Sequence, residues 1–211
     1  MPVSSLNRFT VPLSTDQSSA SQGLLMPKLK YRFRVVLENF GVPGTPTTEI
    51  TKQVINVGRP SLSFEEIKLP VYNSTVKLAG KHTWDPVELK LRDDVSNAVT
   101  KLVGQQVQKQ FDFFEQSSAA SGIDYKFSMR VELLDGGNGA NEPTVLEAFD
   151  LLGCYVQKVA YQGGDYGSAT DPMDITLTIS YDNALQYGAG GAPTGIGEAV
   201  GRTVRTLAIG G

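Results

Sequence analysis

Apolar and polar residues alternate one for one along several segments of the chain, and this alternation limits the possible folds more than any other feature. In Met173–Tyr181, for example, five apolar or aromatic residues alternate with Asp, Thr, Thr and Ser. Successive side chains of a β-strand point to opposite faces of a sheet. The pattern is therefore typical of antiparallel strands that bury one face and expose the other. It occurs in Tyr31–Leu37, Val87–Leu91, Tyr125–Leu133 and Met173–Tyr181, and further strands are expected at Gln53–Val57, Leu62–Leu69, Ser74–Ala79 and Leu151–Tyr161.

One segment has a helical period instead. We expect an amphipathic helix over about residues 95–116, with Asp93 or Asp94 as its N-cap. The sequence therefore predicts an α+β fold, mainly antiparallel β. Two packed sheets form a sandwich or barrel, and the one long α-helix covers an open side. The apolar face of this helix would be made by Val95, Val99, Leu102, Val103, Val107, Phe111 and Phe114.

The two ends of the chain differ from its middle in composition. Residues 1–26 are rich in Ser, Thr and Gln, and they contain too few large apolar side chains to offset the entropy lost on ordering. Residues 188–211 are rich in Gly but still carry Val200, Val204 and Leu207. A docking arm and a disordered tail fit this C-terminal composition equally well. We expect a flexible N-terminal arm (1–26), one β domain (27–187) and a Gly-rich C-terminal arm (188–211).

The sequence contains no pattern that predicts an enzyme, a cofactor or a metal site. His82 is the only histidine and Cys154 the only cysteine, so a catalytic triad has one possible base and a cysteine-rich zinc site is excluded. The formal net charge is −3, so there is no basic excess for gripping nucleic acid by its phosphates. No stretch approaches the ~20 apolar residues that a membrane span needs.

From Ile50 to Leu185 the chain resembles the tail tube family of contractile bacteriophages. The resemblance is carried first by the run Val76–Leu89, which contains an Ala-Gly turn and a Thr-Trp-Asp step between two strands. The run continues through Asp93-Asp94 into the helix, with Gln106 to Phe113 at its end. A second match starts at Leu151-Leu152-Gly153-Cys154-Tyr155-Val156 and ends in the Met173–Tyr181 strand. The order of these elements, more than any short motif, gives the resemblance its specificity.

The resemblance implies a structural protein of the virion. Six copies would form a ring whose inner β-barrel lines a channel, and the rings would stack inside a contractile sheath to a length set by a tape-measure protein. Baseplate and tail-terminator proteins would be further partners, DNA would be in contact only during transit, and assembly would take place in the host cytoplasm. A tube initiator next to the baseplate, or the needle protein of a secretion-type system, fits the same plan. A small-ligand β-barrel carrier is a third reading, and it would be a stable monomer with an internal cavity.

Two groups of residues are candidates for contacts between subunits or rings. The first is the Pro- and Gly-punctuated loop after the first strand, and the second lies at the Ala-Gly-to-Asp run, where a lone histidine is more typical of an interface than of catalysis. The candidates are Val42, Pro43, Gly44, Thr45, Pro46 and Thr47, together with His82, Trp84 and Asp85.

The strands also raise an electrostatic question. A channel for DNA should not be basic, because phosphate contacts would hold the DNA in place. Yet the polar faces of the expected strands carry several basic residues. Either acidic residues such as Glu88 and Glu132 balance them, or the basic residues point away from the channel. The basic residues are Arg32, Arg34, Lys90, Arg92, Lys126 and Arg130.

Overall fold

The computed structural model describes residues 27–42, 47–136, 142–168 and 170–198. The chain divides into two units, Met1–Arg32 and Phe33–Gly211. In the described part of the first unit, the Arg32 N–H donates to the Leu29 carbonyl oxygen (3.2 Å) in a turn. Tyr31 is exposed there, and the strand expected from Tyr31 begins at Phe33, in the second unit.

Seven antiparallel strands of the second unit form one continuous hydrogen-bonded set, in the order β1-β8-β9-β10-β5-β2, with β11 on the free side of β9. The four alternating segments are β1, β5, β8 and β10, each within two residues of its expected range, whereas β11 was not expected. The bounds are β1 Phe33–Glu38, β2 Val54–Val57, β5 Val87–Arg92, β8 Phe127–Leu134, β9 Val145–Tyr161, β10 Asp174–Ser180 and β11 Asn183–Gly188.

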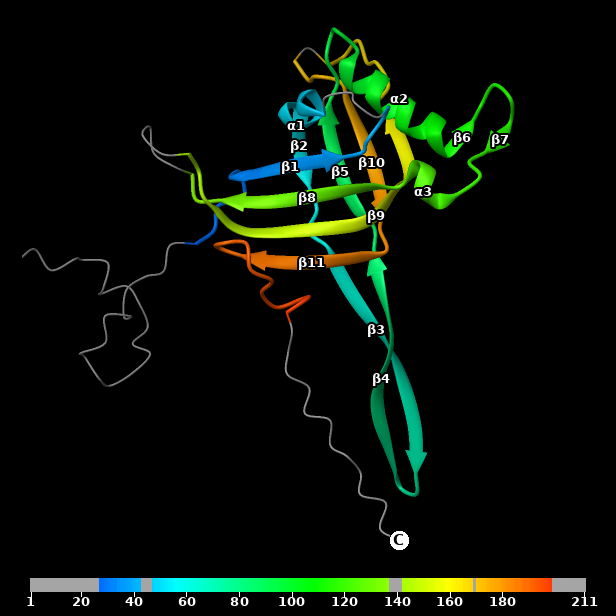
Figure 1. Ribbon diagram of the computed structural model, residues 1–211, viewed down its shortest axis with the longest axis vertical. Coiled ribbons are helices and arrows are strands. Elements are labelled where there is room, and N and C mark those ends of the chain that lie inside the picture. The colour runs from blue at the N-terminus through cyan, green and yellow to red at the C-terminus, as the bar shows by residue number, and fades with distance from the viewer. Residues whose placement is uncertain (1–26, 43–46, 137–141, 169, 199–211) are drawn as a thin grey trace, which may run out of the picture. The chain divides into compact units, whose positions relative to one another are not determined.

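The long strand β9 turns this set into two packed sheets. Its first part, up to Cys154, pairs with β8 and β11, and its last part, from Tyr155, pairs with β10. We call β1, β8, β11 and the first part of β9 sheet 1, and β2, β5, β10 and the last part of β9 sheet 2. Figure 1 shows the strands of sheet 1 crossing steeply over β5 and β10 of sheet 2. The expected fold class is confirmed, and the described strands of one chain form no closed barrel.

One apolar core lies between the two sheets. Leu89 of β5 and Leu177 of β10 contribute from sheet 2, and Met129 of β8 and Leu151 of β9 contribute from sheet 1; all four side chains are at most 1% exposed. The alternation seen in the sequence accounts for this, because every second residue of each strand faces the core.

The expected helix is present as α2 (Ala98–Gln110), but it is shorter than its apolar pattern indicated. Val99, Leu102 and Val103 are buried, whereas Val95 and Phe114 are fully exposed and lie outside the helix. Helical geometry ends at Phe111, which is extended and begins a small hairpin. In this hairpin, β6 (Phe111–Asp112) pairs with β7 (Ser117–Ser118). Two short helices, α1 (Thr48–Gln53) and α3 (Gly122–Tyr125), were not expected.

The N-cap of α2 is Asn97, so the expectation of Asp93 or Asp94 was wrong. Both aspartates nevertheless hold the start of the helix from outside it. The Val99 N–H donates to Asp94 Oδ1 (3.4 Å), and the Thr100 hydroxyl donates to Asp93 Oδ1 (2.8 Å). Acceptors in this position satisfy helix N–H groups that have no partner within the helix.

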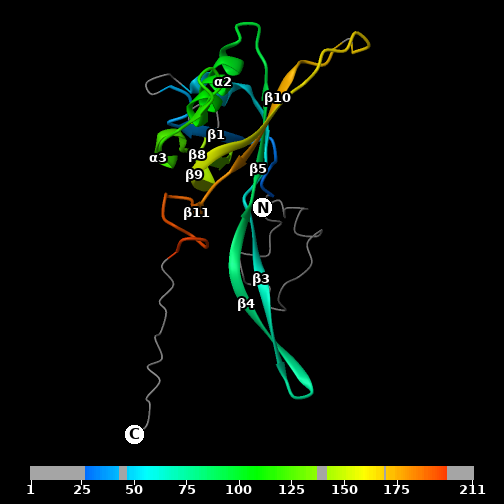
Figure 2. The same cartoon turned by 90° about the vertical axis from the view of Figure 1, so that its right-hand side faces the viewer.

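A long hairpin, β3 (Ser61–Val71) with β4 (Ser74–Asp85), extends the β2–β5 pair beyond sheet 2. Figure 2 shows the hairpin continuing from the N-terminal end of β5, away from both sheets. Both strands are longer than expected from the sequence, and nearly all of their side chains are exposed. The hairpin therefore adds little to the core, and its surface faces solvent.

Candidate assembly surfaces

The face of sheet 1 that points away from the core is polar, and its charges are arranged in register. Arg34 of β1 lies opposite Glu132 of β8, and Arg130 of β8 lies opposite Asp150 of β9. We call this surface the polar face of sheet 1. Residues opposite one another in an antiparallel pair are close enough for their side chains to interact directly.

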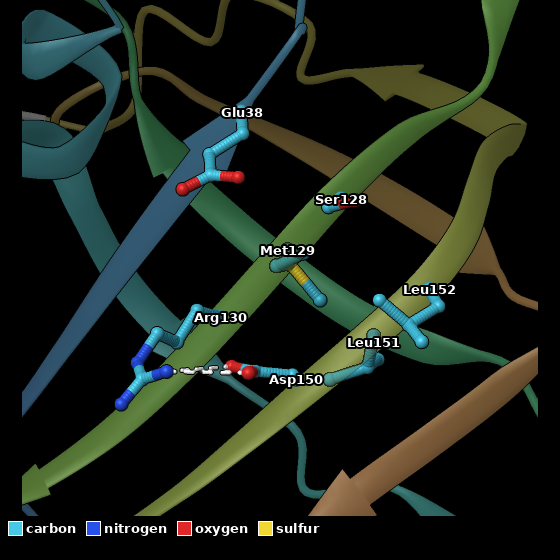
Figure 3. Close-up of a pocket in the computed structure, with 7 residues that line it drawn as sticks. All are labelled: Glu38, Ser128, Met129, Arg130, Asp150, Leu151 and Leu152. Carbon is cyan, nitrogen blue, oxygen red and sulfur yellow. Dashed lines mark hydrogen bonds and ion pairs between the residues drawn. The ribbon is translucent and has the colours of Figure 1, made fainter. Parts of the chain in front are cut away.

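These four side chains form one chain of ion pairs. Arg34 and Glu132 are joined at 2.6 Å, Arg130 Nε donates to Glu132 Oε1 (2.9 Å), and Arg130 Nη1 donates to both carboxylate oxygens of Asp150 (3.2 Å each). Figure 3 shows the Arg130–Asp150 part of the chain. Glu132 is 5% exposed, which is acceptable for a carboxylate because two guanidinium groups surround it.

The polar face is therefore not basic. Across β1, β8, β9 and β11 it carries two arginines and three carboxylates, the third being Glu38. On sheet 2, Lys90 is likewise paired, with Asp174 at 2.6 Å. Acidic residues thus pair with three of the basic residues that the sequence had placed on polar faces, Arg34, Arg130 and Lys90.

The pocket drawn in Figure 3 lies on this polar face, and it is small. Its volume is about 120 Å³, and it lies over the strands β1, β8 and β9. Pockets that hold small organic ligands are typically ~300–1,000 Å³. The polar face is thus a surface without a large pocket, and its one described hollow, beside Arg130 and Asp150, is small.

Burial raises the pKa of the Asp150 carboxyl above its usual value, and the neighbouring Arg130 guanidinium opposes this increase only in part. A carboxyl group with a raised pKa binds a proton more readily in the folded chain than in the unfolded one. Its contribution to stability is present at low pH and is lost as the pH rises through the folded pKa.

Asp150→Asn is therefore expected to gain stability relative to the wild type as the pH rises from about 3 to about 7. The measurement is urea unfolding of both proteins across this range, with the exposed Glu115→Gln as the matched control. A free-energy difference that stays constant with pH would contradict the raised pKa.

The first group of candidate contact residues lies only partly within the described structure. Val42 is exposed, and Thr47 is half-buried, where its hydroxyl donates to the Leu37 carbonyl oxygen (2.9 Å). On either side of this loop, Gly41 is buried and Ile50 is fully buried in the core, so the flanks of the loop have a packing role. The remaining candidates, Pro43, Gly44, Thr45 and Pro46, lie outside the described residues.

The second group of candidates is on β4. His82 is exposed, and Asp85 accepts a hydrogen bond from the Ser61 hydroxyl (2.7 Å) at the base of the hairpin. Trp84 packs against Tyr181, with ring centroids 5.6 Å apart, and against the core. Trp84 therefore anchors the hairpin to the sheets, and His82 and Asp85 are the exposed members of this group.

The sequence analysis did not single out the surface of the hairpin. One face of the hairpin is apolar and exposed, and Ile67 lies opposite Leu78 and Leu69 opposite Val76 on it. The other face carries Lys68, Lys77 and Glu66, with ion pairs of 3.4 Å and 3.1 Å to the glutamate. The alternation of Ile67, Leu69 and Val71 with charged residues was visible in the sequence, but it did not reveal that no core covers the apolar side. We call Ile67, Leu69, Val71, Val76 and Leu78 the apolar face of the hairpin.

Gln106 is a further residue that the sequence analysis did not identify. It is fully buried on α2, where its side-chain oxygen accepts from the Gly41 N–H (2.9 Å) and its amide nitrogen donates to the Tyr125 carbonyl oxygen (2.7 Å). It thus ties the end of β1 and α3 to the helix. Satisfied bonds of this kind allow a polar side chain to be buried.

No protein-family model matches the chain, and no curated protein matches it. Solved structures do match its fold. A chain in the sixfold-symmetrised baseplate of the anti-feeding prophage has a TM-score of 0.56 at 15% identity, with 78% of this chain and 98% of that chain covered. A chain in the extended sheath–tube complex of an extracellular contractile injection system has a TM-score of 0.54 at 13% identity, with 77% and 93% covered.

A chain in the tube-terminating cap of the anti-feeding prophage also matches, with a TM-score of 0.57 at 14% identity and with 85% and 100% of the two chains covered. The fold is therefore the one found in tube and cap complexes of contractile injection systems, as the resemblance to tail tube proteins had indicated. In the described part of the chain, no helix has both the length and the apolar character needed to cross a membrane.

Proposed function

We propose that this protein is the inner tube subunit of a contractile tail, a structural protein that closes into rings of six and stacks into a hollow tube. The observation that carries the proposal is the polar face of sheet 1. It is a four-stranded, charge-balanced wall in a fold shared with chains of tube and cap complexes. The matching baseplate structure has sixfold symmetry, which supports the number of copies.

The directions of the strands in sheet 1 suit ring closure. Its four strands alternate in direction, so β1 and β11 at its two edges run in opposite directions. Copies related by rotation about one axis keep the same axial orientation, and a head-to-tail contact that closes makes a ring. β11 of one copy can then pair antiparallel with β1 of the next, and every subunit continues the same alternation. Closure also removes edges that would otherwise promote aggregation.

The polar face of sheet 1 lines the channel in this proposal. Arg34 and Arg130 are neutralised by Glu132 and Asp150, so the wall offers passing DNA no unpaired row of cations. Binding of DNA depends mainly on phosphate contacts with basic residues. A balanced wall lets DNA slide through without holding it.

The hairpin supplies the contact between stacked rings. No other described segment of the chain covers its apolar face, and exposed apolar patches of this kind are typical of protein interfaces. The outer surface would face a sheath protein, and the two ends of the tube would meet baseplate and tail-terminator proteins. A tape-measure protein would set the length of the tube. The site of action is the virion, after assembly in the host cytoplasm.

A terminal tube component, such as a cap or a baseplate-proximal initiator, is the second candidate. The match to the cap structure, which covers all of that chain, favours it specifically. Such a component forms a ring but does not repeat along the tube. A small-ligand carrier is less well supported. The pocket on the polar face is too small for it, and a larger hollow of about 300 Å³ near Gln162 and Met173 lies in an exposed loop and not between the sheets.

The test is light scattering after size-exclusion chromatography, followed by negative-stain electron microscopy of the concentrated full-length chain. Rings and stacked tubes of uniform width support the tube subunit, and single rings that do not stack support the terminal component. A monomer at every concentration, both alone and with added preformed tube ends, would contradict both.

A further inference from the structure

The outer edge of β11 is already occupied by a later part of the same chain. The Thr194 N–H donates to the Gln186 carbonyl oxygen (2.9 Å), and the Gln186 N–H donates to the Ile196 carbonyl oxygen (2.8 Å). The Gly188 N–H donates to the Ala192 carbonyl oxygen (3.0 Å). We call residues 192–196 the edge segment. It lies on the side of β11 that faces away from β9.

The edge segment leaves little of β11 free for another strand. Besides the N–H groups of Gln186 and Gly188, the third N–H on this side, that of Ala184, is also occupied, because it donates to Asn183 Oδ1 (2.9 Å). Every second residue of a strand directs its backbone groups to the same edge. The outward N–H groups of Ala184, Gln186 and Gly188 are therefore all satisfied within the subunit.

The opposite edge of sheet 1 is free over much of its length. The Leu37 carbonyl oxygen accepts from the Thr47 hydroxyl and so points away from β8. By alternation, the backbone groups of Phe33 and Val35 point the same way. Among the described residues, none makes a hydrogen bond with these outward groups of Phe33 and Val35. Within the part of the chain that the structure describes, sheet 1 thus has one free edge and one covered edge.

The edge segment runs antiparallel to β11, as its bridge between Tyr187 and Pro193 shows. This is the direction that β1 of a neighbouring copy would take in a ring. We propose that the outer edge of β11 is a strand-exchange site. It holds the edge segment in the free subunit and β1 of a second copy in the assembled ring. This inference rests on the proposed function, because it needs the ring that the proposed function describes.

Two glycines, one in the edge segment and one directly after it, give the chain a backbone conformation that lets it lie along β11. Gly195 and Gly197 have φ angles of +80° and +98°, which residues with a Cβ rarely adopt. A Cβ at Gly195 would lie 2.7 Å from Gln186 Oε1, and one at Gly197 would lie 2.8 Å from Leu185 Cδ2. Three backbone hydrogen bonds join the segment to β11, and β1 of a neighbour can replace them one for one. Until then it protects the edge from unwanted pairing.

A reversible disulfide tests the exchange. Tyr187 and Pro193 lie opposite each other, and the neighbouring hydrogen bonds of Gln186 and Gly188 make them a non-hydrogen-bonded pair, in which side chains are closest. The variant is Tyr187→Cys with Pro193→Cys, and the two single variants are the controls. The native Cys154 is buried, and burial raises its pKa to about 12, so its thiol does not compete.

The oxidised double variant is expected to stay monomeric, and the reduced double variant and both single variants are expected to form rings. Rings formed equally well by the oxidised protein would overturn the exchange while leaving the proposed function intact. Absence of rings from the wild type, both alone and with added preformed tube ends, would overturn the proposed function, and the exchange with it.

A variant that loosens the edge segment is expected to speed up ring formation, whereas the disulfide is expected to prevent it. Gly195→Ala with Gly197→Ala places side chains where both φ angles are positive, so initial ring formation should be ~5-fold faster or more, because a larger fraction of subunits has a free edge. Gly163→Ala is the matched control, since a Cβ there meets no atom within 4 Å and its φ is ordinary. A rate equal to that of the control would overturn the exchange.

Discussion

Ile67→Lys combined with Leu78→Lys is expected to abolish stacking of rings and to leave the fold of the subunit unchanged. The two residues lie opposite each other on the apolar face of the hairpin, and 47% of each side chain is exposed. In a stacked tube both positions would be covered, and a buried lysine without a partner is strongly unfavourable. We expect the concentration needed for tube formation to rise at least ~100-fold. In the free subunit the same substitutions are on the surface, so unfolding should change by no more than ~0.5 kcal/mol.

The other face of the hairpin provides the matched control. Lys68→Gln with Lys77→Gln also changes two residues that lie opposite each other, one on each strand, but on the charged face. Tubes should form from this control at nearly the concentration of the wild type. Pelleting and negative-stain microscopy measure assembly, and urea unfolding measures stability. Tubes from the double-lysine variant at wild-type concentration would show that the apolar face is not the stacking contact.

Gly153→Ala is expected to destabilise the subunit by about 2–4 kcal/mol. Gly153 has a φ of +67° and lies in β9, next to the point where the strand passes from sheet 1 to sheet 2. A Cβ there would be 2.1 Å from Asp182 Oδ2. Moving the Asp182 carboxylate away from this position would disturb its ion pair with Lys126. Because the residue joins the two sheets, the strain acts on the whole fold.

Two further variants separate the clash with Asp182 from the strained φ angle as causes of the lost stability. Asp182→Ala added to Gly153→Ala removes the clash but not the strained φ, so part of the lost stability should return. Gly104→Ala makes the same substitution on α2, where a Cβ meets no atom within 4 Å, and it should stabilise the subunit by roughly 0.5–1 kcal/mol. Chemical denaturation measures all three. A Gly153→Ala variant as stable as the wild type would contradict the role of Gly153.

The strands that face water on one side could be predicted from the sequence, because alternation is a local property of a strand. β1, β5, β8 and β10 were found in this way. β11 was missed because Asn183–Gly188 contains Ala184 and Gly188 in place of large apolar residues, and its position is set by pairing with β9. The first part of β9 was missed for a similar reason. Its Glu147–Phe149 run shows no alternation, since Glu147, Ala148 and Phe149 are all buried.

Features that depend on distant contacts could not be read from the sequence. Val95 and Phe114 continue the apolar period of the helix, but the chain leaves helical geometry before it reaches Phe114, and Asn97 begins the helix after Val95. Gln106 looks like a residue of the wet face, yet it bonds to Gly41 and to Tyr125, which lie far from it in the sequence. The apolar face of the hairpin could not be predicted from the sequence for the same reason. Whether that face is exposed depends on which other segments of the chain pack against it.

The polar face of sheet 1 shows how local pattern and distant pairing combine. The sequence placed Arg34 and Arg130 on polar faces, but their charge balance depends on the register that sets Glu132 and Asp150 beside them. A slip of one residue would turn these side chains to the other face. Register between strands is therefore what sets the charge balance of this face.

A cryo-electron microscopy map of rings or tubes assembled from the wild-type chain tests the central claim most directly. The expected result is a channel lined by the polar face of sheet 1, with Arg130 and Asp150 pointing into it and with β11 of each subunit next to β1 of its neighbour. A channel lined instead by sheet 2 or by α2, or an assembly without a closed channel, would contradict the account.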